Sequence, residues 1–180
     1  AREIFMPDFI FKTKPYDHQS EAFTASADRT NFALLMDMGT GKTKTAIDSM
    51  GYCYEEGLID FAIIVAPKGV IRNWIPEIEA HLPERIDREI VLWRPDLTKF
   101  KVFMTVDEST TIKNRQAKRT KAICSVGRGA VMRRILTGSP ITKSPMDLYS
   151  QMEFLSPDIL GFKSYYTFQA RYAVVQRRSM

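Results

Sequence analysis

Short apolar runs alternate with amphipathic stretches along most of the chain. The runs of strand length predict strands at residues 31–36, 61–66, 89–93, 101–106 and 131–136. The run at 61–66 is continuously apolar, which indicates a strand buried on both faces of a parallel sheet. The pattern therefore predicts an α/β fold with a central, mostly parallel sheet and helices on both faces.

Helices are predicted between these strands, where apolar residues recur at helical spacing. They span about residues 15–26, 42–56, 71–82, 114–126 and 145–155. Gly57 suits a helix end and Ser144 an N-cap, whereas Pro76 is expected to kink or restart the third helix. We divide the chain into a lead-in at 1–15, a core at 16–155 and a C-terminal extension at 156–180.

A glycine-bearing turn joins the first predicted strand to the helix at 42–56. Gly39 and Gly41 allow bare backbone N–H groups to approach phosphate oxygens, and Met38 and Thr40 complete the loop. Lys42 supplies a charge for the terminal phosphates, and the Thr43 hydroxyl is a natural Mg²⁺ ligand. A glycine turn with an incidental Lys-Thr would leave the preceding buried strand unexplained. The sequence thus predicts a nucleotide-phosphate site.

The apolar run at 101–106 leads directly into Asp107 and Glu108. An aspartate at this strand end can hold Mg²⁺ through its water shell, and the glutamate can orient or deprotonate an attacking water. The strand at 131–136 ends in Thr137, Gly138 and Ser139, whose hydroxyls could relay between the nucleotide and a nucleic acid. The other interpretation of this last segment is an ordinary turn.

Gln19 lies shortly before the first strand, next to Tyr16 and His18. The amide of a glutamine offers one donor group and one acceptor group, which match the N6/N7 edge of adenine. We predict that Gln19 recognises adenine with help from Tyr16. We expect His18 to be a packing or capping residue.

Composition adds little to these predictions, except through the distribution of charge. An apolar fraction of 44% and a charged fraction of 26% are ordinary for a soluble globular domain, and no run of about 18 apolar residues predicts a membrane span. Two cysteines are too few for a disulfide framework, so we expect a reducing, cytoplasmic setting. The net charge is +5, and residues 113–134 contain basic but no acidic side chains. This tract fits a surface for nucleic-acid phosphates, with a plain solvated face as the alternative.

The strands predicted at 89–93 and 101–106 are separated only by Arg94 to Phe100. A parallel crossover needs about a dozen residues or more. Either the two strands form an antiparallel hairpin, or the natural protein carries residues between Trp93 and Lys101 that this sequence lacks. We favour the second hypothesis.

Taken in order, these blocks resemble the first motor lobe of superfamily 2 helicases, and most of all the Swi/Snf-related double-stranded DNA translocases of prokaryotic or phage type. Residues 16–19 are similar to the adenine-reading Q motif, 37–43 to motif I, 66–68 with Trp74 to motif Ia, 107–110 to motif II and 136–140 to motif III. Met36 stands where a strict P-loop has glycine, which the family tolerates.

The resemblance implies a RecA-like P-loop fold, ATP and Mg²⁺ as cofactors, and ATP-driven movement on double-stranded DNA. It implies DNA contacts at Lys68, Lys113, Asn114 and Arg115. It also implies a partner lobe, which in the family brings arginine fingers to the γ-phosphate. This chain contains no second lobe, so we expect a half-motor with weak ATPase activity of its own, working in the cytoplasm of a bacterial or phage-infected cell and on the nucleoid when DNA-bound.

The sequence departs from the family motifs in two places. Ser109-Thr110 follows the Asp-Glu pair in place of the usual Ala-His or Ala-Asp, so the family's histidine route for coupling hydrolysis to nucleic acid is not present. The family's motif between Ia and II is not found, which agrees with missing residues before Lys101. The alternatives are an RNA helicase, a restriction-enzyme motor subunit, a non-hydrolysing nucleic-acid-binding module with a vestigial nucleotide pocket, and a small P-loop kinase or transferase.

Overall fold

Four parallel strands form a single sheet in the computed structural model, which describes residues 8–86 and 99–173. The spatial order is β1-β4-β3-β2, and the strands are β1 (Asn31–Leu35), β2 (Phe61–Val65), β3 (Val102–Asp107) and β4 (Met132–Thr137). Because all pairings are parallel, the carboxyl ends of the strands lie along one edge. The predicted parallel sheet is confirmed.

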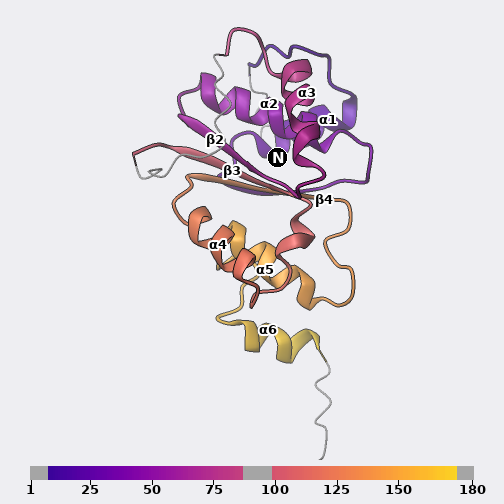
Figure 1. The fold of residues 1–180 in the computed structure, drawn as a ribbon, viewed down its shortest axis with the longest axis vertical. Coiled ribbons are helices and arrows are strands. Elements are labelled where there is room, and N and C mark those ends of the chain that lie inside the picture. Colours follow the sequence, from indigo (N-terminus) through magenta and orange to yellow (C-terminus); the bar gives the residue numbers. More distant parts are fainter. Residues whose placement is uncertain (1–7, 87–98, 174–180) are drawn as a thin grey trace, which may run out of the picture.

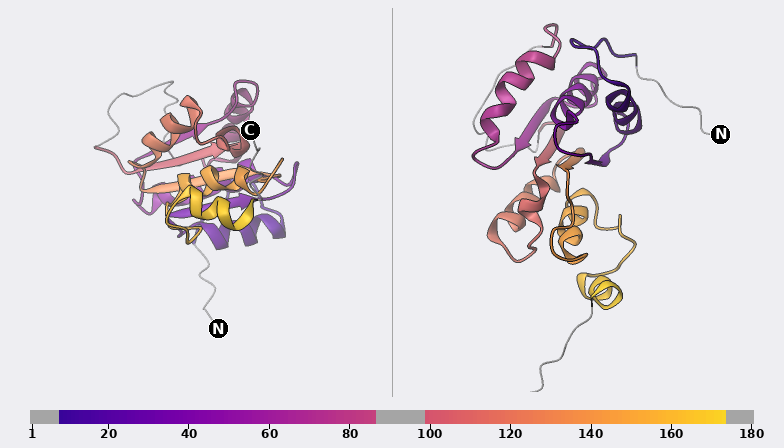
Figure 2. Two further views of the ribbon diagram at one scale, coloured as in Figure 1. Left: turned by 90° about the horizontal axis from the view of Figure 1, so that it is seen from below. Right: turned by 90° about the vertical axis from the view of Figure 1, so that its right-hand side faces the viewer.

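Helices cover both faces of this sheet (Figures 1 and 2). One layer contains α1 (Asp17–Ser26), α2 (Lys42–Glu55) and α3 (Ile71–His81), and the other contains α4 (Lys118–Gly127) and α5 (Met146–Leu155). The short helix η1 (Ser109–Ile112) follows β3, and α6 (Tyr165–Tyr172) lies beyond α5. Within the described ranges, none of the helices has the length and apolar character needed to cross a bilayer.

Strand β3 joins the two hydrophobic cores, and all six of its residues are buried. Phe103 belongs to the core under α1, α2 and α3, whereas Val102, Met104 and Val106 belong to the core on the α4 and α5 side. This division follows from the alternation of side chains along a strand. Burial on both faces explains why four of the six residues in the strand are apolar.

Most predicted element boundaries agree with the structure to within a few residues. The helix predicted from residue 114 begins only at Lys118, because η1 and a turn precede it. Helix α3 continues through Pro76, where a kink or restart was predicted. The strand predicted at 89–93 and most of the join to Lys101 lie outside the described residues.

Helix α6 was not predicted from the sequence, in which residues 156–180 were assigned only as a C-terminal extension. Its first turn is capped by the Ser164 hydroxyl, which accepts the Thr167 N–H at 3.3 Å. Phe168 is 3% exposed and lies against Tyr149 of α5 with ring centroids 5.4 Å apart. The Arg115 guanidinium lies 4.6 Å from the Tyr165 ring centroid. These contacts pack residues 164–173 against α5.

The basic tract at 113–134 is not one surface, which corrects the prediction from the sequence. Arg134 is fully buried, and its guanidinium donates to the Ser26 and Arg29 carbonyls at 2.7 Å each. It also donates to the Thr30 carbonyl at 3.3 Å, and it lies 4.9 Å from the Phe103 ring centroid. Burial lowers the pKa of Arg134 to about 10, so the group stays charged at neutral pH. Its charge is paired with carbonyl groups at the end of α1 and in the segment before β1, and it cannot reach a nucleic acid.

We expect Arg134→Met to destabilise the fold by about 2–3 kcal/mol, because several buried carbonyls would lose their donors. Urea unfolding measures this change. Arg133→Met is the matched control: Arg133 is only half-buried and donates to the Asn31 side chain at 3.0 Å. That variant should lose less than about 1 kcal/mol. Equal losses in the two variants would contradict the assigned role of Arg134.

Candidate active site

The loops that follow the four strands meet at the carboxyl edge of the sheet, where open α/β folds place their ligands. The loops after β1 and β4 are in close contact. A Cβ atom at Gly138 would lie 3.4 Å from the Met36 carbonyl oxygen and 3.5 Å from the Met38 nitrogen. Strand pairing sets this approach, since Leu35 pairs with Thr137. Predicted motifs I and III are thus neighbours.

The phosphate loop between β1 and α2 has the backbone that its sequence predicts. Gly39 and Gly41 have φ values of 77° and 82°, in the left-handed region that favours glycine. Lys42 begins α2, and its ammonium group donates to the carbonyls of Met36 at 2.9 Å and Asp37 at 2.8 Å. The lysine therefore lies over the loop, beside the N-terminus of a helix whose dipole favours anions.

Gln19 is attached to the phosphate loop, a contact that the sequence did not predict. Its amide donates to the Thr40 carbonyl at 3.1 Å and accepts the Tyr16 N–H at 3.0 Å. Gln19 lies so close to Gly41 that a Cβ atom there would be 2.1 Å from the amide nitrogen. His18, which we expected to pack or cap, also donates to the Thr40 carbonyl, at 2.9 Å. Two side chains at the start of α1 therefore hold the loop through a single carbonyl, that of Thr40.

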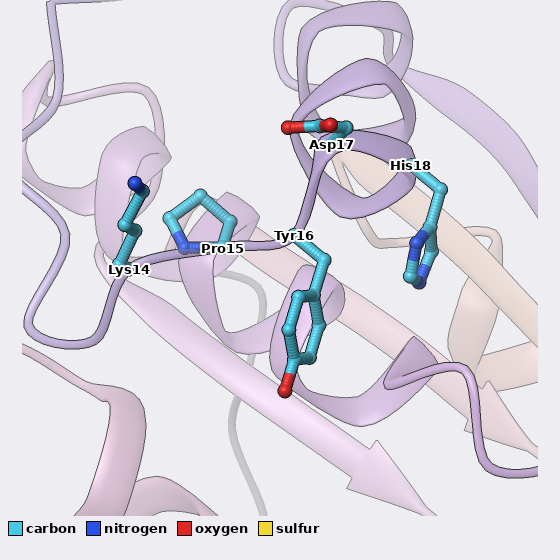
Figure 3. Close-up of a pocket in the computed structure, with 5 residues that line it drawn as sticks. All are labelled: Lys14, Pro15, Tyr16, Asp17 and His18. Atoms are coloured by element: carbon cyan, nitrogen blue, oxygen red, sulfur yellow. The ribbon is translucent and has the colours of Figure 1, made fainter.

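A shallow hollow lies beside this attachment, lined by residues 14–18 (Figure 3). The Tyr16 and His18 rings are nearly parallel, with an interplanar angle of 11° and centroids 6.0 Å apart. Tyr16 is 72% exposed, so one face of its ring can take up a flat ligand. The two rings extend to the same side of the chain, while Asp17 points away from them. This arrangement suits the stacking of a base.

Asp107 is the last residue of β3 and is only 6% exposed. One carboxylate oxygen accepts the Glu108 N–H at 2.8 Å, and the other accepts the indole N–H of Trp74 at 2.9 Å. Glu108 has a φ of 47°, the one positive value at a non-glycine residue in the described ranges. Such strained backbone is concentrated at functional sites. The sequence gave no signal for the hydrogen bond between Trp74 and Asp107.

The residues present fit a magnesium–nucleotide complex. Each oxygen of the Asp107 carboxylate accepts one N–H, and a carboxylate has capacity for further bonds. No group of three or more His, Cys, Asp or Glu side chains in the described ranges could hold a metal alone. Mg²⁺ is usually bound by one or two carboxylates together with substrate phosphates and water. Asp107 and the half-buried Thr43 match that ligand set.

A buried network links motif II to motif III in a way that the sequence did not reveal. The Ser109 hydroxyl donates to the Gln151 side-chain oxygen at 2.6 Å. The Gln151 amide donates to the carbonyls of Pro140 and Asp147, both at 2.7 Å. Thr137 is 1% exposed, and its hydroxyl accepts the Ser139 N–H at 3.2 Å. Gln151 therefore ties the segment after Glu108 to the loop after β4.

The residues predicted to contact DNA differ in solvent exposure and in the contacts that they already make. Lys68 and Asn114 are exposed, but Arg115 is half-buried over an aromatic ring. Lys113 donates to the Thr142 hydroxyl and lies 3.7 Å from the Asp147 carboxylate. Burial acts to raise the pKa of Asp147, but hydrogen bonds from the Thr142 hydroxyl and from two backbone N–H groups, together with the Lys113 charge, lower it to about 2. Of the described basic side chains in the tract, the following are exposed: Lys118, Arg119, Lys121 and Arg128.

Several known proteins are similar to this chain in sequence. Helicase SWR1 from Cryptococcus neoformans is 26% identical over 182 residues, which include 82% of this chain and 14% of that protein. The DNA annealing helicase and endonuclease ZRANB3 is 29% identical in Mus musculus, covering 87% of this chain and 17% of that protein. The chain thus spans less than a fifth of the length of these relatives.

Solved structures agree with the sequence comparison. The Sulfolobus solfataricus SWI2/SNF2 ATPase core in complex with dsDNA superposes with a TM-score of 0.78 and 25% identity. It covers 95% of this chain, which corresponds to 41% of that structure. The same archaeal ATPase core domain in a second structure gives a TM-score of 0.74 and 26% identity. The RecA-like fold expected from the motifs is therefore confirmed.

A family model for the SNF2-related domain matches residues 16–101 and 96–177. These two matched segments contain all five predicted motifs and extend across most of the chain. The chain belongs to the family of SNF2-related domains.

Proposed function

We propose that this chain is the ATP-binding and hydrolysing first lobe of an ATP-dependent double-stranded DNA translocase. The observation that carries this proposal is the arrangement at the carboxyl edge of the sheet. A phosphate loop with Lys42 and Thr43 lies after β1, and an acidic pair lies after β3, on strands joined only through β4. This arrangement supports an ATPase site with its two halves on one parallel sheet.

Each residue at the site has a proposed role. The loop N–H groups at residues 38–41 and the Lys42 ammonium would hold the β- and γ-phosphates. Thr43 and Asp107 would hold Mg²⁺, which when bound neutralises charge that develops on the phosphate oxygens. Glu108 would orient the water and take its proton. The backbone N–H of Glu108 donates to the Asp107 carboxylate, and this hydrogen bond holds the backbone at the end of β3.

Gln19 has two proposed tasks. The chain uses one of its two amide N–H groups and one lone pair of its oxygen, so one of each is left for adenine. The Tyr16 ring would stack on the base from the adjacent hollow. Because Gln19 also donates to the Thr40 carbonyl, a base bound to Gln19 would act directly on the position of the phosphate loop.

The proposed partners are suggested by a related structure. A related ATPase core is described in complex with dsDNA, and this chain corresponds to less than half of that structure. We therefore propose duplex DNA and a second RecA-like lobe as partners, with Lys68, Lys113, Asn114 and Arg115 at the DNA surface and the cytoplasm as the compartment. Thr137, Gly138 and Ser139 would couple hydrolysis to DNA, with Gln151 joining them to motif II.

We expect Glu108→Gln in the complete protein to retain ATP binding and to lower hydrolysis by about 100-fold or more, because the general base is lost. Nucleotide binding and DNA-stimulated phosphate release measure the two effects separately. Lys42→Ala is the control, and it should lose binding as well. Retained turnover in Glu108→Gln would reassign the base, and an unsubstituted protein that binds ATP without hydrolysing it would favour a non-hydrolysing module.

Lys68→Ala should reduce the salt dependence of duplex DNA binding by about one unit in the slope of log K against log salt, because one phosphate contact is removed. Lys101→Ala is a matched control, since Lys101 is also exposed but precedes β3 at the opposite edge of the sheet. Its slope should equal that of the unsubstituted protein. Equal slopes in both variants would exclude Lys68 from the DNA surface.

The natural protein is proposed to carry a further segment between Trp93 and Lys101. The alignment with the mouse relative has 189 positions but includes 87% of 180 residues, or about 157, so about 32 positions are unmatched in this chain. The two segments of the family match also meet at 96–101. Tryptic mapping of the natural protein should give extra peptides between Trp93 and Lys101. A peptide running directly through this junction would refute the proposal.

A further inference from the structure

Trp74 and Asp107 form a buried side-chain hydrogen bond between two elements that are distant in sequence. The indole N–H lies 2.9 Å from the carboxylate oxygen, and the two residues are 2% and 6% exposed. Trp74 is the fourth residue of α3, and Asp107 is the last residue of β3. A hydrogen bond to a charged group is stronger than one between neutral groups.

The carboxylate is held by donors on both of its oxygens. The Glu108 N–H binds one oxygen and the Trp74 indole binds the other, so rotation of the Asp107 side chain would break one bond or both. Without the indole N–H, the Glu108 N–H would hold only one of the two carboxylate oxygens. A carboxylate that must receive a metal in one orientation gains most from such a second donor.

We propose that Trp74 is a positioning residue that fixes the Asp107 carboxylate for the magnesium–nucleotide complex. The inference rests on the proposed function and extends it to a residue on a different element. Packing alone does not require tryptophan at this position, because phenylalanine would also provide apolar contact with the core. What tryptophan adds is an N–H group, and buried indoles usually have a partner for it.

The placement of Trp74 also connects two regions of the site. Helix α3 begins in the turn after β2, where the Pro67 carbonyl accepts the N–H groups of Val70 at 2.8 Å and Ile71 at 3.0 Å. Lys68 lies in that turn and is exposed. Contact between this turn and a phosphate backbone would therefore act on the same helix that holds the metal-binding carboxylate.

The test uses the full 180-residue chain with Mn²⁺ and ADP as probes. Electron paramagnetic resonance measures free Mn²⁺ and so gives its affinity for the protein–ADP complex without any turnover. Trp74→Phe keeps an aromatic ring and removes the N–H group. We expect its affinity for Mn²⁺ in the presence of ADP to fall by about 10-fold to 100-fold, the usual effect of losing a group that orients a metal ligand.

Two controls separate positioning from packing. Phe23→Leu removes a comparable aromatic ring from the same core, where Phe23 is 2% exposed, and should lower thermal stability without changing Mn²⁺ affinity. Benzothienylalanine at position 74 keeps the size and shape of the indole but replaces N–H by sulfur. It should bind Mn²⁺ as weakly as Trp74→Phe, although its side chain fills the same space as tryptophan.

Fluorescence provides a second measurement. The chain has two tryptophans, so Trp93→Phe leaves Trp74 as the sole emitter. Paramagnetic Mn²⁺ with ADP should quench this emission, whereas ADP without metal should not. Full Mn²⁺ affinity in Trp74→Phe or in the benzothienylalanine variant would overturn the inference alone. A failure of the unsubstituted chain to bind Mn²⁺ with ADP would overturn the proposed function and the inference together.

Discussion

The parallel pairing of β3 between β2 and β4 is the constraint on which the site depends. All six residues of β3 are buried, and the strand pairs with β2 on one side and with β4 on the other. The register with β4 pairs Asp107 with Leu136, while the pairing of β1 with β4 aligns Leu35 with Thr137. The acidic pair, the phosphate loop and the loop after β4 therefore emerge at one edge.

Buried polar groups join the elements around this sheet. Arg134 binds the Ser26 carbonyl at the end of α1, Trp74 binds Asp107, and Gln151 binds the segments after β3 and β4. Lys44 and Asp48 form a further buried pair at 2.5 Å in α2, where burial raises the pKa of Asp48 to about 6 against the opposing effect of Lys44. Each group would be costly to bury alone, so each contact favours one arrangement of its two elements.

Some of the positively charged side chains are buried or engaged in contacts within the protein, and others are exposed. Arg134 is internal, and Lys113 and Arg115 are partly engaged with a carboxylate network and an aromatic ring. The exposed positive charge of the tract is concentrated at α4 and the turn after it, while Lys68 supplies positive charge separately at the turn after β2. Net charge in the sequence therefore overstates the charge that is available to a polyanion.

The sequence by itself determined the α/β class, the phosphate loop and the acidic pair, because local periodicity, glycine conformation and strand-end position are encoded within a few neighbouring residues. It did not reveal α6, whose aromatic residues pack against α5 rather than following a simple apolar stripe. Nor did it reveal the partners of Gln19, Trp74 and Arg134. Those partners are separated along the chain by 21, 33 and up to 108 residues, so only the tertiary structure could bring their polar groups together.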